Sequence, residues 1–349
     1  MPSGIMEEFK KSKVPGEVIL STSLASGRLG GLGNPKIHKA VMDTPSIPRG
    51  DLEAAYLEVA LFAQEERLPK WRLWLDGFSI TREFKPQYVL PVDDALFAKV
   101  LFDVTPIYKS ENPRHFVTVM YDGSTPVTVG HINLLIIRRT EEAFYNFTYL
   151  SGAQALAPGE VVEIEAELEE EPRGNGILRV VGILPSKSAR VSVSVNGGEP
   201  RYLGDAVGAD ELSFEDLELS KTNRVKVEHL GSGTPYYPKH FILSTLLLGE
   251  AVYREPRIVF SDVVFEGGVL RAKVANVGES APDSLFMVVM NMGIPLARLE
   301  VSSLKPGEVR DVEFKLKLPH GTHNILLRAV ARKLSKITYT DRRIQVSVG

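Results

Sequence analysis

Short runs in which apolar and polar residues alternate recur along most of the chain, separated by Gly, Pro, Asn and Asp. Clear examples are 71–75 (WRLWL), 116–120 (FVTVM), 191–195 (VSVSV) and 224–228 (RVKVE). A period of two puts alternate side chains on opposite faces of a half-buried strand. Few segments hold a 3.6-residue apolar stripe between helix caps. The pattern therefore predicts an all-β protein built from β-sandwiches.

An internal repeat gives the clearest view of the organisation. Four segments of the first copy are matched, in the same order, by four segments of the second. His131 and His240 are expected to start the same strand in the two copies, with Gly233 as a single insertion, which favours a role in the fold over a catalytic pair. The matched segments are 71–77 and 191–197, 101–104 and 212–217, 117–126 and 225–235, and 131–137 and 240–246.

The repeat also decides an ambiguous segment, 51–67, whose apolar residues fall near one face of a helix that Asp51 could cap. In the second copy the matching residues, 177–184 (ILRVVGIL), are strand-like and end at Pro185. We therefore expect a strand at 55–62.

These patterns predict four parts of the chain. Residues 1–45 form an N-terminal extension or linker with one strand, and 46–150 form a first jelly-roll-like β-sandwich. Residues 151–253 repeat that sandwich, and 254–349 form an immunoglobulin-like sandwich. The fold prediction is thus two tandem jelly-roll-like β-sandwiches followed by an immunoglobulin-like one.

The first copy resembles the galactose-binding-like jelly rolls of archaeal and bacterial surface proteins over about residues 45–140. The resemblance rests on Ile47-Pro48, on 55–57 (AYL), on 102–105 (FDVT) and on the apolar strand 134–137. It implies a module that contacts ligands outside the cell. Family resemblance therefore favours an extracellular or cell-surface location.

From about Pro256 the chain is similar to CARDB-type (cell-adhesion-related) immunoglobulin-like domains. It carries the Asn-x-Gly of that family at 276–278 and its Leu-x-Pro-Gly-Glu turn at 304–308. Gly278 is expected to take a positive φ where a hairpin turns, and Pro306-Gly307 suits the centre of a type II turn. The resemblance implies a spacer or binding platform and names no ligand.

Composition and charge exclude several classes of protein. The 349 residues include no Cys, so disulfides, thiolate metal sites and cysteine nucleophiles are ruled out. A formal net charge of −3 disfavours bulk polyanion binding, and we expect no nucleic-acid partner. The longest nearly apolar run, 241–249, is too short to span a bilayer, and residues 1–13 show no secretion signal.

Two groups of side chains are weighed as metal ligands. Glu163, Glu165, Glu167 and Glu169 would share one face of a strand within 161–171 (VVEIEAELEEE). That acid row could collect a hard cation such as Ca²⁺, although a solvated face is the favoured interpretation. His320 and His323 have a chelating spacing but sit in a turn without a third ligand nearby. We therefore expect no cofactor, with Ca²⁺ as the alternative.

Aromatic residues supply the ligand-binding candidates: Trp71, Trp74, Tyr236 and Tyr237. The two Trp residues, three positions apart on one strand, lie on opposite faces, so at most one belongs to the core. The two Tyr residues follow a Gly-rich turn, where loop aromatics often stack on sugars or partner proteins.

No nucleophile elbow, zinc-protease motif or nucleotide loop occurs, so the sequence favours a non-enzymatic protein and names no catalytic residue. The leading hypothesis is contact with a carbohydrate or a protein, including self-association, at a cell or particle surface. One alternative is a carbohydrate-active or peptide-N-glycanase-like hydrolase with paired carboxylates between the jelly rolls. Another is a structural subunit of a virion or filament.

Overall fold

The computed structural model describes residues 2–231, 240–334 and 336–348. Its strands pair in antiparallel ladders, and the one helix among the described residues is the 3-10 turn η1 (Thr105–Ile107). The prediction of an all-β fold built from sandwiches is confirmed. The segment that could have been a helix is a strand, β5 (Leu52–Ala63). The chain divides into two compact units, 1–252 and 253–349.

The first sandwich of unit 1 has an outer and an inner sheet. Outer sheet 1 has the strand order β4 (Ile37–Asp43), β10 (Arg114–Tyr121), β6 (Trp71–Leu75), β7 (Phe78–Thr81). Inner sheet 1 has the order β2 (Gly16–Ser23), β11 (Val127–Arg139), β5, β9 (Ala95–Asp103), β8 (Tyr88–Val92), with β3 (Gly27–Leu29) also on β11. Alternate residues of both sheets, among them Leu57, Trp71 and Leu134, form its buried core.

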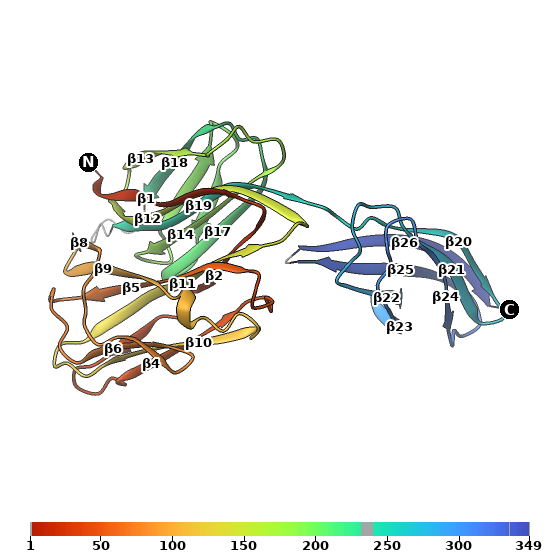
Figure 1. The fold of residues 1–349 in the computed structure, drawn as a ribbon, viewed down its shortest axis with the longest axis horizontal. Coiled ribbons are helices and arrows are strands. Elements are labelled where there is room, and N and C mark those ends of the chain that lie inside the picture. Colours follow the sequence, from red (N-terminus) through yellow and green to blue (C-terminus); the bar gives the residue numbers. More distant parts are fainter. Residues whose placement is uncertain (1, 232–239, 335, 349) are drawn as a thin grey trace. The chain divides into compact units, whose positions relative to one another are not determined.

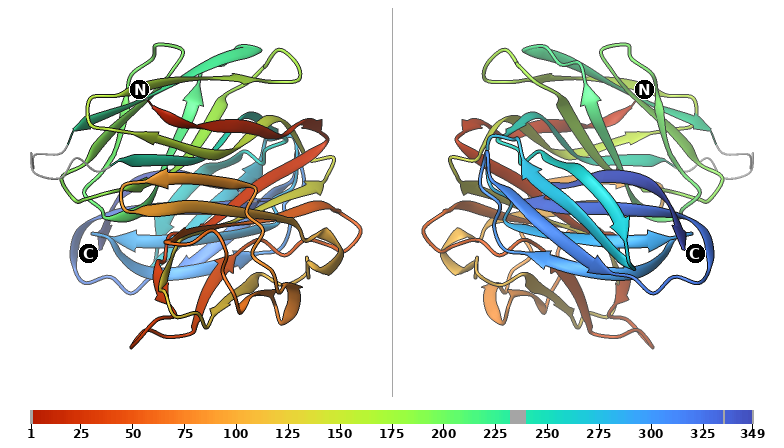
Figure 2. Two further views of the ribbon diagram at one scale, coloured as in Figure 1. Left: turned by 90° about the vertical axis from the view of Figure 1, so that its left-hand side faces the viewer. Right: turned by 90° about the vertical axis from the view of Figure 1, so that its right-hand side faces the viewer.

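The second sandwich repeats this arrangement. Inner sheet 2 has the order β1 (Ser3–Val14), β12 (Ala143–Leu156), β19 (Phe241–Tyr253), β14 (Gly176–Leu184), β17 (Gly208–Leu217). Outer sheet 2 has the order β13 (Val161–Glu167), β18 (Thr222–Gly231), β15 (Arg190–Val195), β16 (Arg201–Gly204). A separate core that includes Leu178, Val193 and Val225 lies between them. The second sandwich lies above the first in Figures 1 and 2.

Six strands of the first sandwich have a counterpart at the same position in the sheet order of the second. The pairs are β4 and β13, β10 and β18, β6 and β15, β11 and β19, β5 and β14, β9 and β17. The N-terminal 45 residues differ from the prediction, because they form four strands, β1 to β4, rather than one. β1 joins the second sandwich, whereas β2 to β4 join the first. The boundaries of the four predicted parts stay predictions.

The two inner sheets pack against each other. Apolar side chains from both sheets form two clusters, one around Leu135, Phe147 and Leu247 and one around Phe97 and Ile242. Unit 1 therefore holds two sandwich cores joined by a third buried layer between the inner sheets.

The strand register corrects the match between His131 and His240. Phe116 pairs with Val41 as Arg224 pairs with Glu165. His131 follows a bulge opposite Ala60, in the place where Thr245 follows a bulge opposite Val181. His131 therefore corresponds to Thr245 and not to His240. The second copy has six more residues between these positions, so a single insertion does not account for the difference.

Unit 2 has one sheet of β20 (Ile258–Glu266), β21 (Val269–Asn276) and β24 (Val309–Lys315), and one of β23 (Ile294–Val301), β22 (Ser284–Asn291), β25 (Gly321–Lys333) and β26 (Lys336–Val348). Its buried residues, such as Val274, Met287 and Leu327, form a core of its own. Unit 2 is thus also a β-sandwich.

The two glycines that were matched to the CARDB motifs have different structural reasons. Gly307 has φ +77°, as the predicted type II turn requires. Gly278 was expected at positive φ, and that expectation is wrong, because Gly278 is not among the positive-φ glycines. A Cβ there would lie 2.3 Å from the Arg257 backbone nitrogen. Close approach of two backbone segments is what excludes a side chain at 278.

Candidate binding site

A two-residue turn closes the hairpin between β6 and β7. Asp76 (φ 49°) and Gly77 (φ 84°) both have positive φ, as the turn that matches strand twist requires, and Asp-Gly is a preferred pair for it. The Asp76 backbone N–H donates to the Phe116 carbonyl at 2.9 Å, and the Phe116 N–H donates to Asp76 Oδ1 at 2.8 Å. Asp76 is thus hydrogen-bonded to both the carbonyl group and the N–H of Phe116, and it holds strand β10 at that residue.

The second carboxylate oxygen of Asp76 faces the core. Asp76 Oδ2 lies 2.6 Å from Nδ1 of the buried His115. The His115 ring stacks on Tyr108 with 4.4 Å between ring centroids, and the Tyr108 hydroxyl donates to Thr44 Oγ1 at 3.2 Å. Burial raises the pKa of Tyr108 to about 12, so its hydroxyl keeps its proton at neutral pH. Both Asp76 oxygens are therefore occupied by partners within the protein.

The outward face of outer sheet 1 carries apolar and aromatic side chains. Phe116 is 47% exposed and pairs with the exposed Val41 on β4. Thr118 pairs with Lys39 on one side and with Trp74 on the other. Large apolar side chains left in solvent on one sheet face are typical of a surface that another molecule covers.

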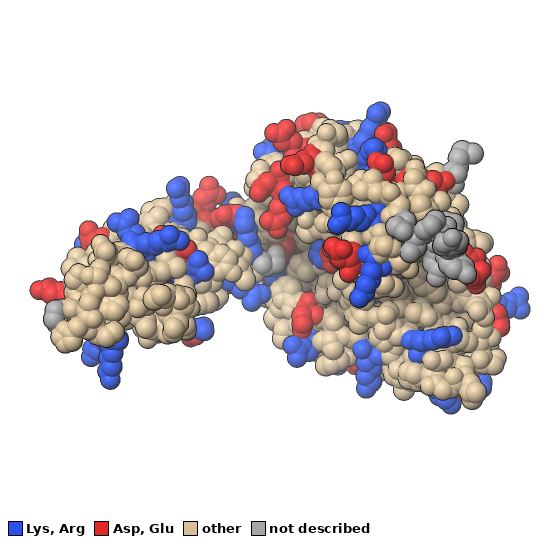
Figure 3. Space-filling model, turned by 180° about the vertical axis from the view of Figure 1, so that it is seen from behind, with Lys and Arg blue, Asp and Glu red and all other residues tan. Residues whose placement is uncertain are grey.

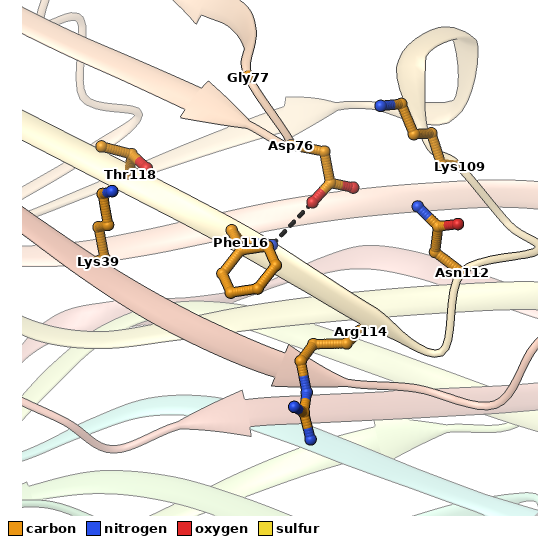
Figure 4. A pocket seen from close by; sticks show the side chains of 8 residues that line it. All are labelled: Lys39, Asp76, Gly77, Lys109, Asn112, Arg114, Phe116 and Thr118. Atoms are coloured by element: carbon orange, nitrogen blue, oxygen red, sulfur yellow. Dashed lines mark hydrogen bonds between the residues drawn. The ribbon is translucent and has the colours of Figure 1, made fainter.

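A pocket of about 400 Å³ opens beside Phe116 (Figure 4). It is lined by strand residues from β4 and β10, by the Asp76 turn, and by two residues of the loop that follows η1. The volume falls in the range of small-molecule sites in proteins. Its lining residues are Lys39, Asp76, Gly77, Lys109, Asn112, Arg114, Phe116 and Thr118.

Three of the lining residues are cations. Arg114 Nε donates to Asp43 Oδ1 at 2.9 Å, and Lys109 Nζ lies 5.1 Å from the centre of the exposed Phe78 ring. No hydrogen bond or ion pair joins the Lys39 side chain to another residue in the described part of the chain. Asp76, the one carboxylate in the lining, is turned toward His115 and the Phe116 N–H. The pocket therefore has an excess of positive charge.

The second sandwich has a pocket of about 530 Å³ in the corresponding place. Its turn is Asn196-Gly197, with φ of 52° and 74°, and Asn196 exchanges the same two hydrogen bonds with Arg224 at 2.9 Å. The side chain of Asn196 also reaches the buried Asn223, in the place of His115. Its lining residues are Glu163, Glu165, Ser194, Asn196, Gly197, Thr222, Arg224 and Lys226.

The two pockets share a backbone and differ in chemistry. The register matches Val41 with Glu165, Phe116 with Arg224, Trp74 with Ser194, Lys39 with Glu163 and Thr118 with Lys226. Every apolar member of the first set is polar or charged in the second. At these three positions the apolar side chains are therefore a property of the first sandwich and are not imposed by the fold.

The four ligand-binding candidates from the sequence fall in three places. Trp71 is wholly buried and packs edge-on against Phe84, so it has no surface to offer a ligand. Trp74 lies half-buried on the outward face of outer sheet 1, as the spacing of the two Trp residues predicted. Tyr236 and Tyr237 lie outside the described residues. Of the described candidates, Trp74 is the one that can reach a ligand.

The sequence analysis missed Phe116, Lys39, Lys109, Asn112 and Arg114. Lys109 and Asn112 reach the pocket from a loop, so no strand periodicity identifies them. Comparing matched strands of the repeat would have identified Phe116, because Arg224 replaces it.

Several of the side chains weighed as metal ligands make other contacts in the structure. β13 ends at Glu167, so Glu169 lies beyond the strand, and the Lys11 side chain donates to Glu167 Oε2 at 3.0 Å. His323 Nε2 lies 2.9 Å from the Pro319 carbonyl oxygen. Within residues 2–231, 240–334 and 336–348, no group of three or more His, Asp or Glu side chains is placed to hold a metal ion. The Ca²⁺ alternative stays a prediction.

A buried polar cluster lies between the two inner sheets. Glu58 Oε1 accepts from Asn133 at 2.9 Å and forms an ion pair with Lys99 Nζ at 3.3 Å, and its Oε2 accepts from Ser151 at 2.6 Å. His131 Nε2 lies 2.7 Å from Ser244 Oγ. The members of this interface cluster are Glu58, Lys99, His131, Asn133, Tyr149, Ser151, Ser244 and Thr245, all buried.

Burial and charge set the protonation states in the interface cluster. Burial raises the pKa of Glu58, but the charge of Lys99 and the hydrogen bonds of Ser151 and Thr245 outweigh it, so its pKa is lowered. Burial lowers the pKa of Lys99 to about 8, against the opposing attraction of Glu58. Burial likewise lowers the pKa of His131 to about 4. At neutral pH the cluster therefore holds an ion pair and a neutral imidazole.

This cluster bears on the hydrolase alternative. Glu58 is 2% exposed, and its oxygens are engaged by side chains of both sandwiches. A substrate cannot reach a carboxylate that is enclosed in this way. Glu58 thus gives no support to a hydrolase that uses it as a catalytic carboxylate.

No protein-family model matches the sequence, and no curated protein matches it. Among solved structures, it is similar to the β-glucuronidase from Ruminococcus gnavus, at 10% identity and a TM-score of 0.20, over 58% of this chain and 36% of that one. It is also similar to the glycoside hydrolase domain of Endo-D from Streptococcus pneumoniae R6, at 12% identity and a TM-score of 0.20, over 57% and 33%. The chain spans about a third of the length of those proteins.

Within residues 2–231, 240–334 and 336–348, no helix is long and apolar enough to cross a membrane.

Proposed function

We propose that this protein is a non-enzymatic binding protein that holds a carbohydrate on the outward face of outer sheet 1. The observation that carries the proposal is the exposed apolar face of Phe116, Val41 and Trp74 beside a pocket, at positions that are polar in the second sandwich. The resemblance of the first copy to galactose-binding-like modules supports a carbohydrate and a cell or particle surface as the setting.

The chemistry of the face suits a sugar. The C–H faces of a sugar ring pack on aromatic rings, and its hydroxyls need fixed hydrogen-bonding groups around them. Phe116, in the pocket lining, and Trp74, on the same outward sheet face, supply the rings, while the Asn112 amide and the Thr118 hydroxyl supply donors and acceptors in the pocket. The Asp76 turn holds the Phe116 backbone in place before any ligand arrives, which lowers the entropic cost of binding.

A glycan array probed with the full chain tests the proposal. We expect binding to a subset of glycans, and we expect Phe116→Ala and Trp74→Ala each to weaken it by about tenfold, the usual effect of truncating a central aromatic contact. Tyr202→Ala is the matched control, because Tyr202 is an exposed aromatic on outer sheet 2.

Two results would contradict the proposal: no glycan bound by the intact chain, or equal losses from Phe116→Ala and Tyr202→Ala. Circular dichroism of each variant separates a lost contact from a lost fold.

A further inference from the structure

The pocket beside Phe116 is unusual for its charge on a protein that is acidic overall. The chain has a formal net charge of −3, and basic and acidic side chains are interspersed over the face shown in Figure 3. Three basic residues, Lys39, Lys109 and Arg114, by contrast, line this one pocket. The whole-chain charge excludes a broad basic surface, but it does not exclude a local site for a single anionic group.

Among the described residues, the one carboxylate in the lining, Asp76, does not cancel this charge on the side open to a ligand. One carboxylate oxygen of Asp76 accepts a hydrogen bond from the Phe116 N–H, and the other contacts His115. The Asp76 side chain is almost wholly buried. Lys39 and Lys109 are exposed and pair with no carboxylate among the described residues, whereas Arg114 shares its charge with Asp43. Two ammonium groups are therefore available to a ligand in the pocket.

The corresponding pocket of the second sandwich shows that the fold does not require this charge. Glu163 takes the place of Lys39 there, directly across from Lys226, and Glu165 stands across from Arg224. Its two acids and two bases balance. The excess of positive charge in the first pocket is a property of its own side chains.

From these observations we infer that the first pocket takes an anionic group, a carboxylate or a sulfate, carried by the sugar that packs on Phe116. This inference rests on the proposed function and names its ligand class, an acidic carbohydrate. Lys39 and Lys109 bind the anion, Arg114 contributes a donor shared with Asp43, and Asn112 and Thr118 hydrogen-bond to ring hydroxyls. Charge-assisted hydrogen bonds of this kind are stronger and shorter than neutral ones.

Isothermal titration of the full chain with three oligosaccharides tests the inference: an oligogalacturonate, its neutral methyl ester, and a sulfated oligogalactose. We expect the acidic ligands to bind at least about tenfold more tightly than the ester, the effect of one charge-assisted contact. Raising the salt concentration should weaken the acidic ligands more than the ester, because exposed charges are screened. The carboxylate and sulfate arms identify which anion is preferred.

Matched variants locate the effect. Lys39→Gln should lower the affinity for the preferred acidic ligand by about tenfold and leave the neutral ester unchanged. Lys226→Gln is the control, since Lys226 is a basic residue in the pocket of the second sandwich, and it should change neither affinity.

The outcomes separate the inference from the proposed function. If the ester binds as tightly as the acid and Lys39→Gln has no effect, the anionic specificity is wrong, while carbohydrate binding stands. If none of the oligosaccharides nor any array glycan binds, both are wrong. If polyglutamate competes as well as the oligogalacturonate, the pocket is a general anion site and the carbohydrate assignment fails.

Discussion

Phe116 on β10 and Arg224 on β18 occupy the same place in two copies of one sandwich. In each copy the Asx side chain at the hairpin turn accepts the backbone N–H of that residue, at 2.8 Å for Phe116 and 2.9 Å for Arg224. The backbone of the site is therefore shared, and the side chains differ. One scaffold thus carries two different outward faces, and the one with exposed apolar side chains at Val41, Trp74 and Phe116 is the candidate for binding.

The Asp76 turn should stabilise the first sandwich through its side chain. Asp76→Ala leaves the Phe116 N–H and the buried His115 without their acceptor, and we expect a loss of about 1–3 kcal/mol in the free energy of unfolding. Asp76→Asn keeps an acceptor for Phe116 and should lose less. Urea unfolding followed by fluorescence measures both, and equal losses would show that the hydrogen bond to Phe116 contributes nothing.

Lys99 should contribute to the stability of the fold mainly because Glu58 is buried beside it. Lys99→Met leaves a buried carboxylate unpaired, and we expect a loss of about 3–5 kcal/mol. The double variant Lys99→Met/Glu58→Gln should recover most of that loss, because no buried charge remains. Additive losses in a double-mutant cycle would contradict this account.

A matched control exists in the second copy. Arg179 and Glu211 occupy the places of Glu58 and Lys99, so the ion pair recurs with its charges exchanged. The side chains of this second pair are 25% and 18% exposed, whereas those of Lys99 and Glu58 are nearly wholly buried. Arg179→Met should therefore cost less than Lys99→Met, since solvent screens and hydrates the charge that remains.

Stability should fall on acidification through the titration of His131. Its pKa is lowered by burial to about 4 from an ordinary 6.5, so folding favours the neutral ring. The stabilisation is full above pH 6.5 and is lost as the pH falls from 6.5 toward 4, by at most about 3 kcal/mol.

The variant His131→Gln isolates this contribution. Burial also lowers the pKa values of His38 and His229, so their protonation likewise opposes folding as the pH falls below 6.5. The difference in unfolding free energy between the unmodified protein and His131→Gln, measured by urea titration between pH 4.5 and 7, should shrink as the pH falls. A difference that does not change with pH would contradict the buried neutral ring.

Substitution by Ala should have different effects at two glycines of unit 2. Gly278→Ala places a Cβ 2.3 Å from both the Arg257 nitrogen and the Glu255 oxygen, so backbone must move. Gly307→Ala meets no atom within 4 Å and costs only the left-handed backbone, about 1–2 kcal/mol. Hydrogen exchange of peptides covering β20 and β21 in the full chain measures both. A larger loss of protection in Gly307→Ala would contradict the close-approach explanation.

Sequence periodicity was sufficient to predict the strands in which one face is apolar and the other polar. The run 71–75 became β6 with Trp71 inside and Trp74 outside, as the alternation predicts. It was insufficient for β4, where the outward Ile37 and Val41 are apolar and hide the period of two. The feature that concealed β4 is the one that makes its outward face a candidate binding surface.

Local sequence also misled in one place. His131 and His240 share a residue type, which drew the match away from the backbone register, in which the counterpart of His131 is Thr245. Register and burial depend on contacts between distant strands, so a single sequence does not contain them in readable form.

The central claim is that the side chains of outer sheet 1, and not the scaffold, bind the carbohydrate. Co-sedimentation with insoluble polysaccharides tests it on variants that exchange the two faces. The double variant Val41→Glu/Phe116→Arg, which carries the residues of outer sheet 2 on outer sheet 1, should remain in the supernatant with every polysaccharide that retains the unmodified chain. Full retention of this variant, together with loss of retention in Glu165→Val/Arg224→Phe, would contradict the account.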